Sequence, residues 1–176
     1  NFRDRNYKVY YNIVDIKKTV SGSDRIIMLY WIDDTDFCVL KNKYDNERLI
    51  VCLAQIDNYD EVKNSIDEVN WPIALAEIDK RINSFVSRLN GFVRKYENDK
   101  YLIIFESKYL KQVEEKRFDI LDDIRSIDLG NRIPVTLSMG VGAYGKSPVE
   151  LYEYAKAGMD IALGRGGDQV VVKKND

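Results

Sequence analysis

Histidine is absent from this 176-residue sequence, and cysteine and proline occur only two and three times. Without histidine, Ser-His-Asp and Cys-His catalysis, imidazole metal sites and a histidine pH switch are all excluded. Cys38 and Cys52 are too few for a disulfide framework or a four-cysteine zinc site, and free thiols favour a reducing compartment. An excess of positive charge is also missing, since 27 Lys and Arg stand against 29 Asp and Glu, which argues against a nucleic-acid partner.

A long apolar run is missing as well. The longest, at residues 26–32, is far shorter than the ~20 residues that a membrane helix needs, and no signal-peptide pattern is visible. Because the chain opens at Asn1 and not at Met, we expect it to be cut from a longer protein whose membrane anchor lies outside it. What is present, 45% hydrophobic and 32% charged residues, is the composition of a globular protein with about one domain.

The N-terminal part predicts a hairpin followed by a helix. Aromatic and β-branched residues dominate positions 7–14 and 25–32, and turn-forming residues lie at 21–24. A lone hairpin is marginally stable in water, so this one must pack on something. Residues 37–44 are predicted to form a short connecting helix, and we place a domain boundary within residues 36–47.

The remainder of the chain has a mixed α/β pattern. A nearly continuous apolar run at 49–56 is typical of a central strand that is covered on both faces. The elements predicted after it are a helix from Asp57 to about Val69, a helix from Pro72 to Gly91, strands at 92–95 and 101–105, a helix capped by Ser107 and stopped by Gly130, a strand at 135–141, a helix opened by a capping box at 147–150, and a strand at 169–172. An antiparallel-rich sheet with helices packed on one face satisfies this order, so the fold class is α+β.

Two acidic clusters are candidates for chemistry, residues 55–60 at a strand end and residues 97–100 in a hairpin turn. Carboxylates from both could share a divalent metal, because magnesium binds one or two carboxylates together with phosphate oxygens. In the structural alternative, Asp57 or Asn58 caps a helix and Asp99 is a turn residue. Spacing alone favours this alternative.

Two glycine-rich segments are also candidates, and a structural interpretation is favoured for each of them. Glycines beside Arg165 in segment 164–168 could cradle a phosphate, but the segment follows a helix, so a helix end with a turn is favoured. Segment 138–142 is interpreted as a strand with a close backbone neighbour.

Three landmarks resemble the GGDEF domain, the diguanylate cyclase fold. They are Gln55-Ile56-Asp57, the segment 95–101 (KYENDKY), and the segment 137–141 (LSMGV). The match spans about residues 49–173. It implies a ferredoxin-like palm, as in nucleotidyl cyclases, with a nucleotide and metal site where the first two landmarks meet.

The departures from the family pattern lie at the metal and phosphate positions. Gln55 stands where the family has a metal-binding aspartate, and Lys100 replaces a glutamate. Glu97 and Asn98 replace two glycines, while Asp99 keeps the acidic third position. Two unit charges ~4 Å apart interact by about 4 kcal/mol at an effective dielectric of ~20, so a lysine here disfavours a metal. The resemblance therefore implies that the site is degenerate and is not a functional diguanylate cyclase.

The resemblance also assigns site candidates. Asp57, Asn58, Asp60 and Lys100 are the nucleotide-binding candidates. Asp99 is the metal candidate, with Asp57 as a weaker one, and magnesium with ATP is the cofactor these residues imply. Lys63 lies near the position where an asparagine reads guanine in the family.

Two octapeptides, at 55–62 (QIDNYDEV) and 162–169 (ALGRGGDQ), are similar to the GdpP/YybT proteins. These are membrane-anchored bacterial cyclic di-AMP phosphodiesterases with a PAS sensor, a degenerate GGDEF domain and a catalytic DHH/DHHA1 module. Segment 29–35 resembles the last PAS strand. The resemblance implies a PAS tail at 1–35, a linker helix at 36–48 and a degenerate GGDEF domain at 49–176, in the cytoplasmic part of a membrane-anchored protein.

Three functions remain open. The first is regulatory, with the PAS and DHH/DHHA1 domains of the same polypeptide as partners. The second is weak magnesium-dependent ATP hydrolysis, in which Asp57, Asp60 and Asp99 hold the metal and Lys100 contacts phosphate. The third is a dimerisation platform, because unpaired strand edges seek partners.

Overall fold

The computed structural model describes residues 5–15, 25–128 and 133–174, and the chain divides into two compact units, 1–45 and 46–176. The turn predicted at 21–24 and the helix stop predicted at Gly130 lie outside the described residues. In the described part, none of the helices is both long enough and apolar enough to cross a bilayer.

The first unit contains the predicted hairpin. Strands β1 (Tyr7–Asp15) and β2 (Arg25–Asp33) pair in antiparallel register, with Tyr7 opposite Asp33. Helix α1 (Thr35–Glu47) follows, and the Thr35 hydroxyl donates a hydrogen bond to the Asp33 carboxylate over 2.5 Å. Every residue of β2 is exposed, so both faces of this strand present apolar side chains to solvent. The PAS assignment of this segment stays a prediction.

The second unit is built on a five-stranded sheet in the order β4-β5-β3-β6-β7. Its strands are β3 (Leu49–Ile56), β4 (Phe92–Lys95), β5 (Lys100–Glu106), β6 (Leu137–Ala143) and β7 (Val170–Lys174). All neighbouring pairs are antiparallel except β6 and β7, which are parallel. This mixed, antiparallel-rich sheet confirms the predicted α+β class.

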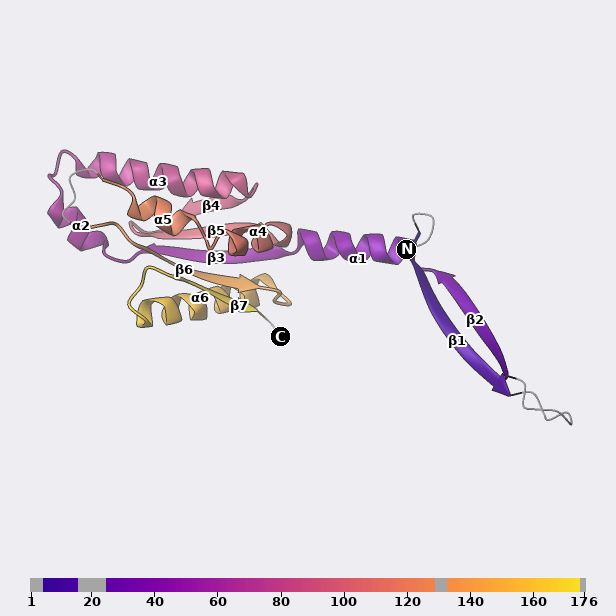
Figure 1. Cartoon of the computed structure of the whole chain (residues 1–176). Helices are drawn as coiled ribbons and strands as arrows, with labels where there is room; N and C mark the ends of the chain where they lie inside the picture. Colours follow the sequence, from indigo (N-terminus) through magenta and orange to yellow (C-terminus); the bar gives the residue numbers. More distant parts are fainter. Residues whose placement is uncertain (1–4, 16–24, 129–132, 175–176) are drawn as a thin grey trace, which may run out of the picture. The chain divides into compact units, whose positions relative to one another are not determined.

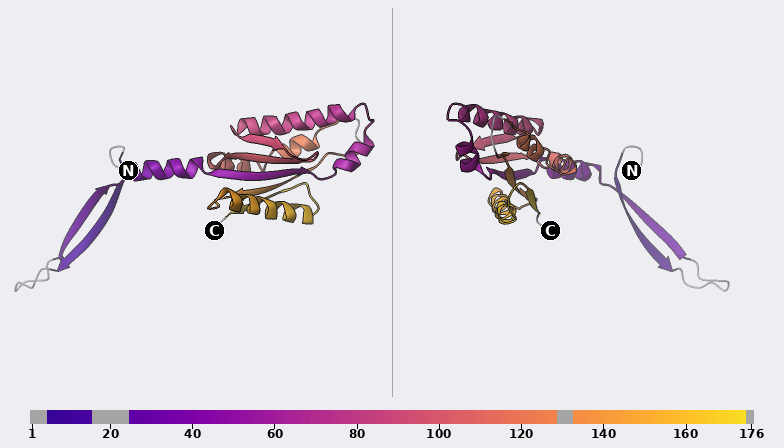
Figure 2. Two further views of the ribbon diagram at one scale, coloured as in Figure 1. Left: turned by 180° about the vertical axis from the view of Figure 1, so that it is seen from behind. Right: turned by 60° about the vertical axis from the view of Figure 1, so that its left-hand side comes forward.

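Helices cover both faces of this sheet, so the prediction of helices on one face is wrong (Figures 1 and 2). Helices α3 (Trp71–Arg88) and α5 (Ile120–Arg125) lie on one side, and α6 (Pro148–Gly164) lies on the other. The side chains of β3 divide between them: Ile50 and Cys52 join the larger core, whereas Val51 and Leu53 pack with residues of α6. The apolar run of β3 has no polar alternation because both of its faces are buried.

The helix predicted from Asp57 to about Val69 is shorter in the structure. Helix α2 (Tyr59–Ser65) ends where Ile66 becomes extended, at φ −109° and ψ 143°. Helix α3 then ends at Arg88, and Asn90, not Gly91, takes the left-handed conformation with φ 45°. Gly91 has a different role, because a Cβ there would lie 2.8 Å from the Ile104 carbonyl oxygen.

The long third helix predicted from Ser107 is broken into three pieces. They are a 3₁₀ turn at Ser107–Tyr109, α4 (Leu110–Glu115) and α5. Arg117 and Phe118 separate α4 from α5 with φ angles of 51° and 52°, and this bend buries the Phe118 side chain. Ser107 does not occupy an N-cap position, because the N-cap residue of the 3₁₀ turn is Glu106 and that of α4 is Tyr109.

The contact between β6 and α6 confirms two predictions. The Ser147 hydroxyl accepts a hydrogen bond from the Glu150 N–H, which is half of the predicted capping box. A Cβ added to Gly140 would lie 2.0 Å from the Ala155 carbonyl oxygen, so segment 138–142 is a strand whose glycine lets the helix backbone approach.

Candidate functional site

The end of β3 and the β4–β5 hairpin meet, as the resemblance implied. The Gln55 side-chain amide donates a hydrogen bond of 3.0 Å to the Asp99 carboxylate. The backbone also joins the two segments, because the Ile56 N–H donates to the Asp99 carbonyl over 2.9 Å. The hairpin carboxylate thus lies next to an amide, which is neutral and a weaker ligand for magnesium than a carboxylate.

Lys100 adds a positive charge to this hairpin. Its ammonium group lies 2.7 Å from the Glu97 carboxylate. The hydrogen bond to Glu97 raises the pKa of Lys100, so the lysine stays charged at neutral pH. Glu97 and Asn98 are exposed, and their side chains occupy the turn where the family has two glycines.

Asp57 is held by the turn that follows α6. One of its carboxylate oxygens accepts the Asp168 N–H at 2.8 Å. Gly166, Gly167 and Asp168 have φ angles of 101°, 77° and 55°, which direct this N–H toward Asp57. The Asp168 side chain pairs with Arg125 of α5 at 2.8 Å. The segment 164–168 is therefore a helix end with a turn, and it also joins α5 and α6 to the end of β3.

Neither of the other two nucleotide-binding candidates acts as a helix cap. Asn58 occupies the N-cap position of α2, but its side chain makes no capping hydrogen bond. Instead, its amide donates to the Pro134 carbonyl over 2.8 Å and its oxygen accepts the Thr136 N–H. Asp60 lies exposed in the first turn of α2. Asn58 therefore does not cap α2 with its side chain, as the structural alternative had it, and instead its side chain hydrogen-bonds to the segment that precedes β6.

The carboxylates of the site do not form a metal-binding cluster. Within the described residues, no group of three or more His, Cys, Asp or Glu side chains is placed to hold a metal ion. Asp57 and Asp99 have separate partners, and one oxygen of Asp57 is buried without a partner in the described part of the chain. The residues do not fit a resident metal, and magnesium that arrives with a nucleotide stays a prediction.

A pocket of about 450 Å³ lies beside α2 and the start of α3. Its lining residues are Lys63, Asn64, Ile66, Glu68 and Trp71. The Trp71 ring meets the Tyr59 ring edge to face, with centroids 5.1 Å apart. The pocket thus offers a cation and an aromatic surface near the position that the resemblance assigned to base recognition.

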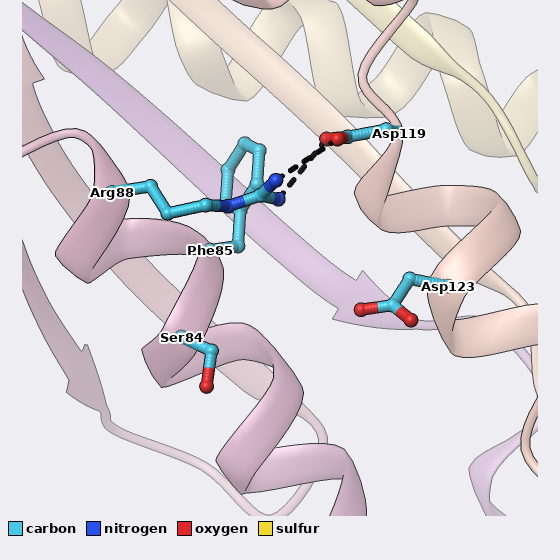
Figure 3. A pocket seen from close by; sticks show the side chains of 5 residues that line it. All are labelled: Ser84, Phe85, Arg88, Asp119 and Asp123. Carbon is cyan, nitrogen blue, oxygen red and sulfur yellow. Dashed lines mark hydrogen bonds and ion pairs between the residues drawn. The ribbon is translucent and has the colours of Figure 1, made fainter.

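A second pocket, of about 430 Å³, opens between α3 and α5 (Figure 3). Arg88 extends over the Phe85 ring and reaches Asp119, whose two carboxylate oxygens accept hydrogen bonds of 3.1 and 3.2 Å. The guanidinium group is already neutralised by this carboxylate. None of the lining residues is a predicted site residue.

Sequence reasoning missed a buried polar group under the hairpin. The Tyr101 hydroxyl donates a hydrogen bond of 2.6 Å to Asp79, and the Lys95 ammonium lies 3.1 Å from the same carboxylate. Burial raises the pKa of Tyr101, and Asp79 raises it further. Asp79 follows the buried Ile78 on α3, and the helical spacing of the apolar residues gave no signal for it.

Comparison with known proteins identifies the family to which this chain belongs. The sequence model for the cyclic-di-AMP phosphodiesterase GdpP-like GGDEF domain matches residues 54–176. The cyclic-di-AMP phosphodiesterase GdpP of Geobacillus thermodenitrificans is 32% identical over 85% of this chain, and that of Bacillus subtilis is 31% identical over 83%. The chain spans only 23% and 22% of these relatives, less than a quarter of their length.

Solved structures agree on the fold. The active GGEEF domain of a diguanylate cyclase from Vibrio cholerae superposes with a TM-score of 0.61, over 80% of this chain and 90% of that one, at 15% identity. That identity supports the fold alone. The family assignment rests on the sequence match, which covers most of the second unit. The chain belongs to the GGDEF domain family of GdpP-like cyclic-di-AMP phosphodiesterases.

Proposed function

We propose that this chain is a regulatory module of a cyclic di-AMP phosphodiesterase whose catalytic domain lies elsewhere in the polypeptide, and that it does not cyclise GTP. The observation that carries the proposal is the hydrogen bond from Gln55 to Asp99. Where a cyclase of this family would place two metal-binding carboxylates, this chain has one carboxylate, an amide bonded to it, and the charged Lys100 next in sequence.

The physical consequence is a site with little affinity for free divalent metal. Transfer of a phosphoryl group by two metals needs carboxylates that clamp both ions. Asp57 is held by the turn after α6, and Lys100 keeps its charge through Glu97. A nucleotide that entered the site would therefore bind with little or no turnover. Binding without chemistry suits a sensor.

A nucleotide is the ligand class that the α2 pocket favours. Lys63 offers a charge to phosphate, and Trp71 offers an aromatic surface to a base. Magnesium accompanied by ATP is the cofactor pair we propose to test first. Weak ATP hydrolysis is the second candidate, which the retained carboxylates of Asp57 and Asp99 support.

The proposal is tested in the full-length protein by the rate of cyclic di-AMP hydrolysis with and without ATP or GTP. We expect one nucleotide to change the rate, and Lys63→Glu to abolish at least nine-tenths of that response. Lys111→Glu is the matched control, because Lys111 lies on α4 with a side chain 86% exposed and a long, weak contact of 3.9 Å to Glu115.

The outcomes separate the candidates. Deletion of residues 49–174 without any change in basal rate or nucleotide response contradicts a regulatory role. Release of ADP that is lost in Asp99→Ala favours the ATPase candidate. A nucleotide response that Lys63→Glu leaves intact contradicts the assignment of the pocket.

A further inference from the structure

The residues that lead from β3 into α2 are each fastened to a different segment of the domain. Asp57 accepts the Asp168 N–H, and the Asn58 side chain bonds to the segment that precedes β6. Tyr59 opens α2 and contacts Trp71, which opens α3. In Figures 1 and 2, α2 and the start of α3 lie together at one end of the sheet. Of these contacts, the one made by Tyr59 reaches a residue that lines the α2 pocket.

The contact between Tyr59 and Trp71 has an aromatic part and a polar part. The two rings lie with their centroids 5.1 Å apart and their planes at 81°. Burial raises the pKa of Tyr59, and a hydrogen bond with Trp71 opposes this shift. Because the indole N–H is the only donor of a tryptophan side chain, the indole donates this bond and the Tyr59 oxygen accepts it. Together, the ring contact and the hydrogen bond define the orientation of the indole.

The backbone of Trp71 is fixed as well. Its N–H donates to the Asp67 carbonyl over 3.0 Å, and Pro72 follows in the first turn of α3, where its ring restricts the backbone. The side chains of Trp71 and Tyr59 are both partly buried and pack against the larger core. Trp71 therefore has little conformational freedom left to lose when a ligand enters the pocket.

This arrangement determines what Trp71 can offer a ligand. Since its N–H is already bonded within the protein, the indole presents the face of its ring, and nucleobases stack on such faces. Lys63 lines the same pocket, is exposed, and makes no ion pair or hydrogen bond with any described residue. A base stacked on Trp71, with its phosphate at Lys63, uses both the aromatic surface and the charge of the pocket.

We infer that Tyr59 is a positioning residue of the nucleotide pocket: its ring and hydroxyl hold the Trp71 indole so that the indole face meets the base. Tyr59 acts through Trp71 and needs no contact with the nucleotide. The inference rests on the proposed function, because it takes the α2 pocket as the nucleotide site. An aromatic surface that is oriented before the ligand arrives strengthens binding, since less side-chain freedom is lost.

Nuclear magnetic resonance of the chain labelled with nitrogen-15 observes Trp71 directly. The chain has two tryptophans, so two indole N–H signals are expected, and Trp31→Phe identifies the signal that belongs to Trp71. Tyr59→Phe keeps the ring and removes the acceptor of the indole hydrogen. We expect this hydrogen to exchange with solvent about fivefold faster, or more, in Tyr59→Phe than in the unchanged chain.

The same samples are titrated with Mg²⁺ and ATP and, separately, with Mg²⁺ and GTP. The nucleotide that binds should displace the ring-proton signals of Trp71 upfield, which is the signature of a stacked base. We expect its affinity to fall about threefold or more in Tyr59→Phe. Tyr109→Phe is the matched control and should change neither quantity, because Tyr109 follows the opposite end of β5, packs on the same core, and accepts a hydrogen bond of 2.7 Å from Asn90.

The outcomes separate this inference from the proposed function. A nucleotide that binds Tyr59→Phe and Tyr109→Phe with equal affinity would overturn the role of Tyr59 and leave the nucleotide pocket in place. Equal exchange of the indole hydrogen in both variants would also overturn it, since Tyr59 would then not hold the indole. If neither ATP nor GTP displaces the Trp71 signals at millimolar concentration, the pocket assignment of the proposed function fails, and the role of Tyr59 fails with it.

Discussion

Asp57 and Asp99 lie beside the end of the same strand, yet each has its own partner. Asp99 accepts the Gln55 amide, and Asp57 accepts the Asp168 N–H. At the residue scale, each of these two carboxylates therefore already accepts a hydrogen bond from a donor of the protein itself. The sequence predicted which positions would meet, because their spacing follows the family, but not the contact from Asp168, which depends on three successive positive φ angles after α6.

Gly167 is the most demanding position in this turn. Its φ is 77°, and a Cβ would lie 2.8 Å from the Asp57 carboxyl carbon. We expect Gly167→Ala to lower the free energy of unfolding by about 1–3 kcal/mol. Gly164→Ala is the control, because Gly164 ends α6 and a methyl group there would have no atom within 4 Å apart from the helix's own adjacent backbone and its two chain neighbours. It should be neutral or stabilising by up to ~1 kcal/mol. Denaturant unfolding distinguishes them, and equal effects would contradict the role of the turn.

Tyr101 gives the protein a pH dependence in the alkaline range. Burial raises its pKa above the ~10 of an unfolded tyrosine, so the unfolded chain loses this proton first. The contribution of Tyr101 to stability is complete below pH ~10 and is lost as the pH rises toward the folded-state pKa. We expect Tyr101→Phe to cost about 1–2 kcal/mol at pH 8, since it removes the bond to Asp79.

The same variant has a second signature. The difference in unfolding free energy between the unchanged chain and Tyr101→Phe should shrink between pH 9 and 11, because the variant has no hydroxyl to titrate at this position. Chemical unfolding at several pH values measures this difference. A gap that stays constant or widens would show that the Tyr101 proton is not linked to folding.

At the scale of elements, the β4–β5 hairpin contains three of the four positions that the resemblance marks as departures from the cyclase pattern. Its two strands were predicted at 92–95 and 101–105 on either side of a polar turn, and the structure has them at Phe92–Lys95 and Lys100–Glu106. The helix after β5 could not be predicted as broken, because the bend at Arg117 and Phe118 is set by burial of Phe118, a tertiary effect. The apolar run of β3 indicated a strand that is covered on both faces, but the order of elements led to the wrong prediction of helices on one face.

The hairpin can be converted toward a metal site. In Gln55→Asp with Lys100→Glu, carboxylates replace an amide and a cation beside Asp99. We expect the double variant to bind Mg²⁺ or Mn²⁺ at least tenfold more tightly than the unchanged chain in calorimetric titration. Lys111→Glu, which has the same charge change as Lys100→Glu, should bind like the unchanged chain. Equal affinity in all three proteins would contradict the claim that these two positions exclude metal.

At the scale of the whole molecule, the family and the fold are established, whereas the absence of cyclase activity is a proposal that rests on Gln55 and Lys100. Two short motifs were enough to predict the family. Segment 55–62 runs from the end of β3 into α2, and segment 162–169 runs from the end of α6 into the turn before β7.

Incubation of the purified chain with Mg²⁺ and GTP, followed by chromatographic separation of the products, tests the central claim most directly. Because Gln55 and Lys100 leave Asp99 without a second metal-binding carboxylate in the described site, we expect GTP to remain without formation of a cyclic dinucleotide. In a parallel sample with ATP, slow release of ADP would show that the chain hydrolyses this nucleotide. A cyclic dinucleotide formed from GTP would contradict the proposal that this site does not support two-metal chemistry.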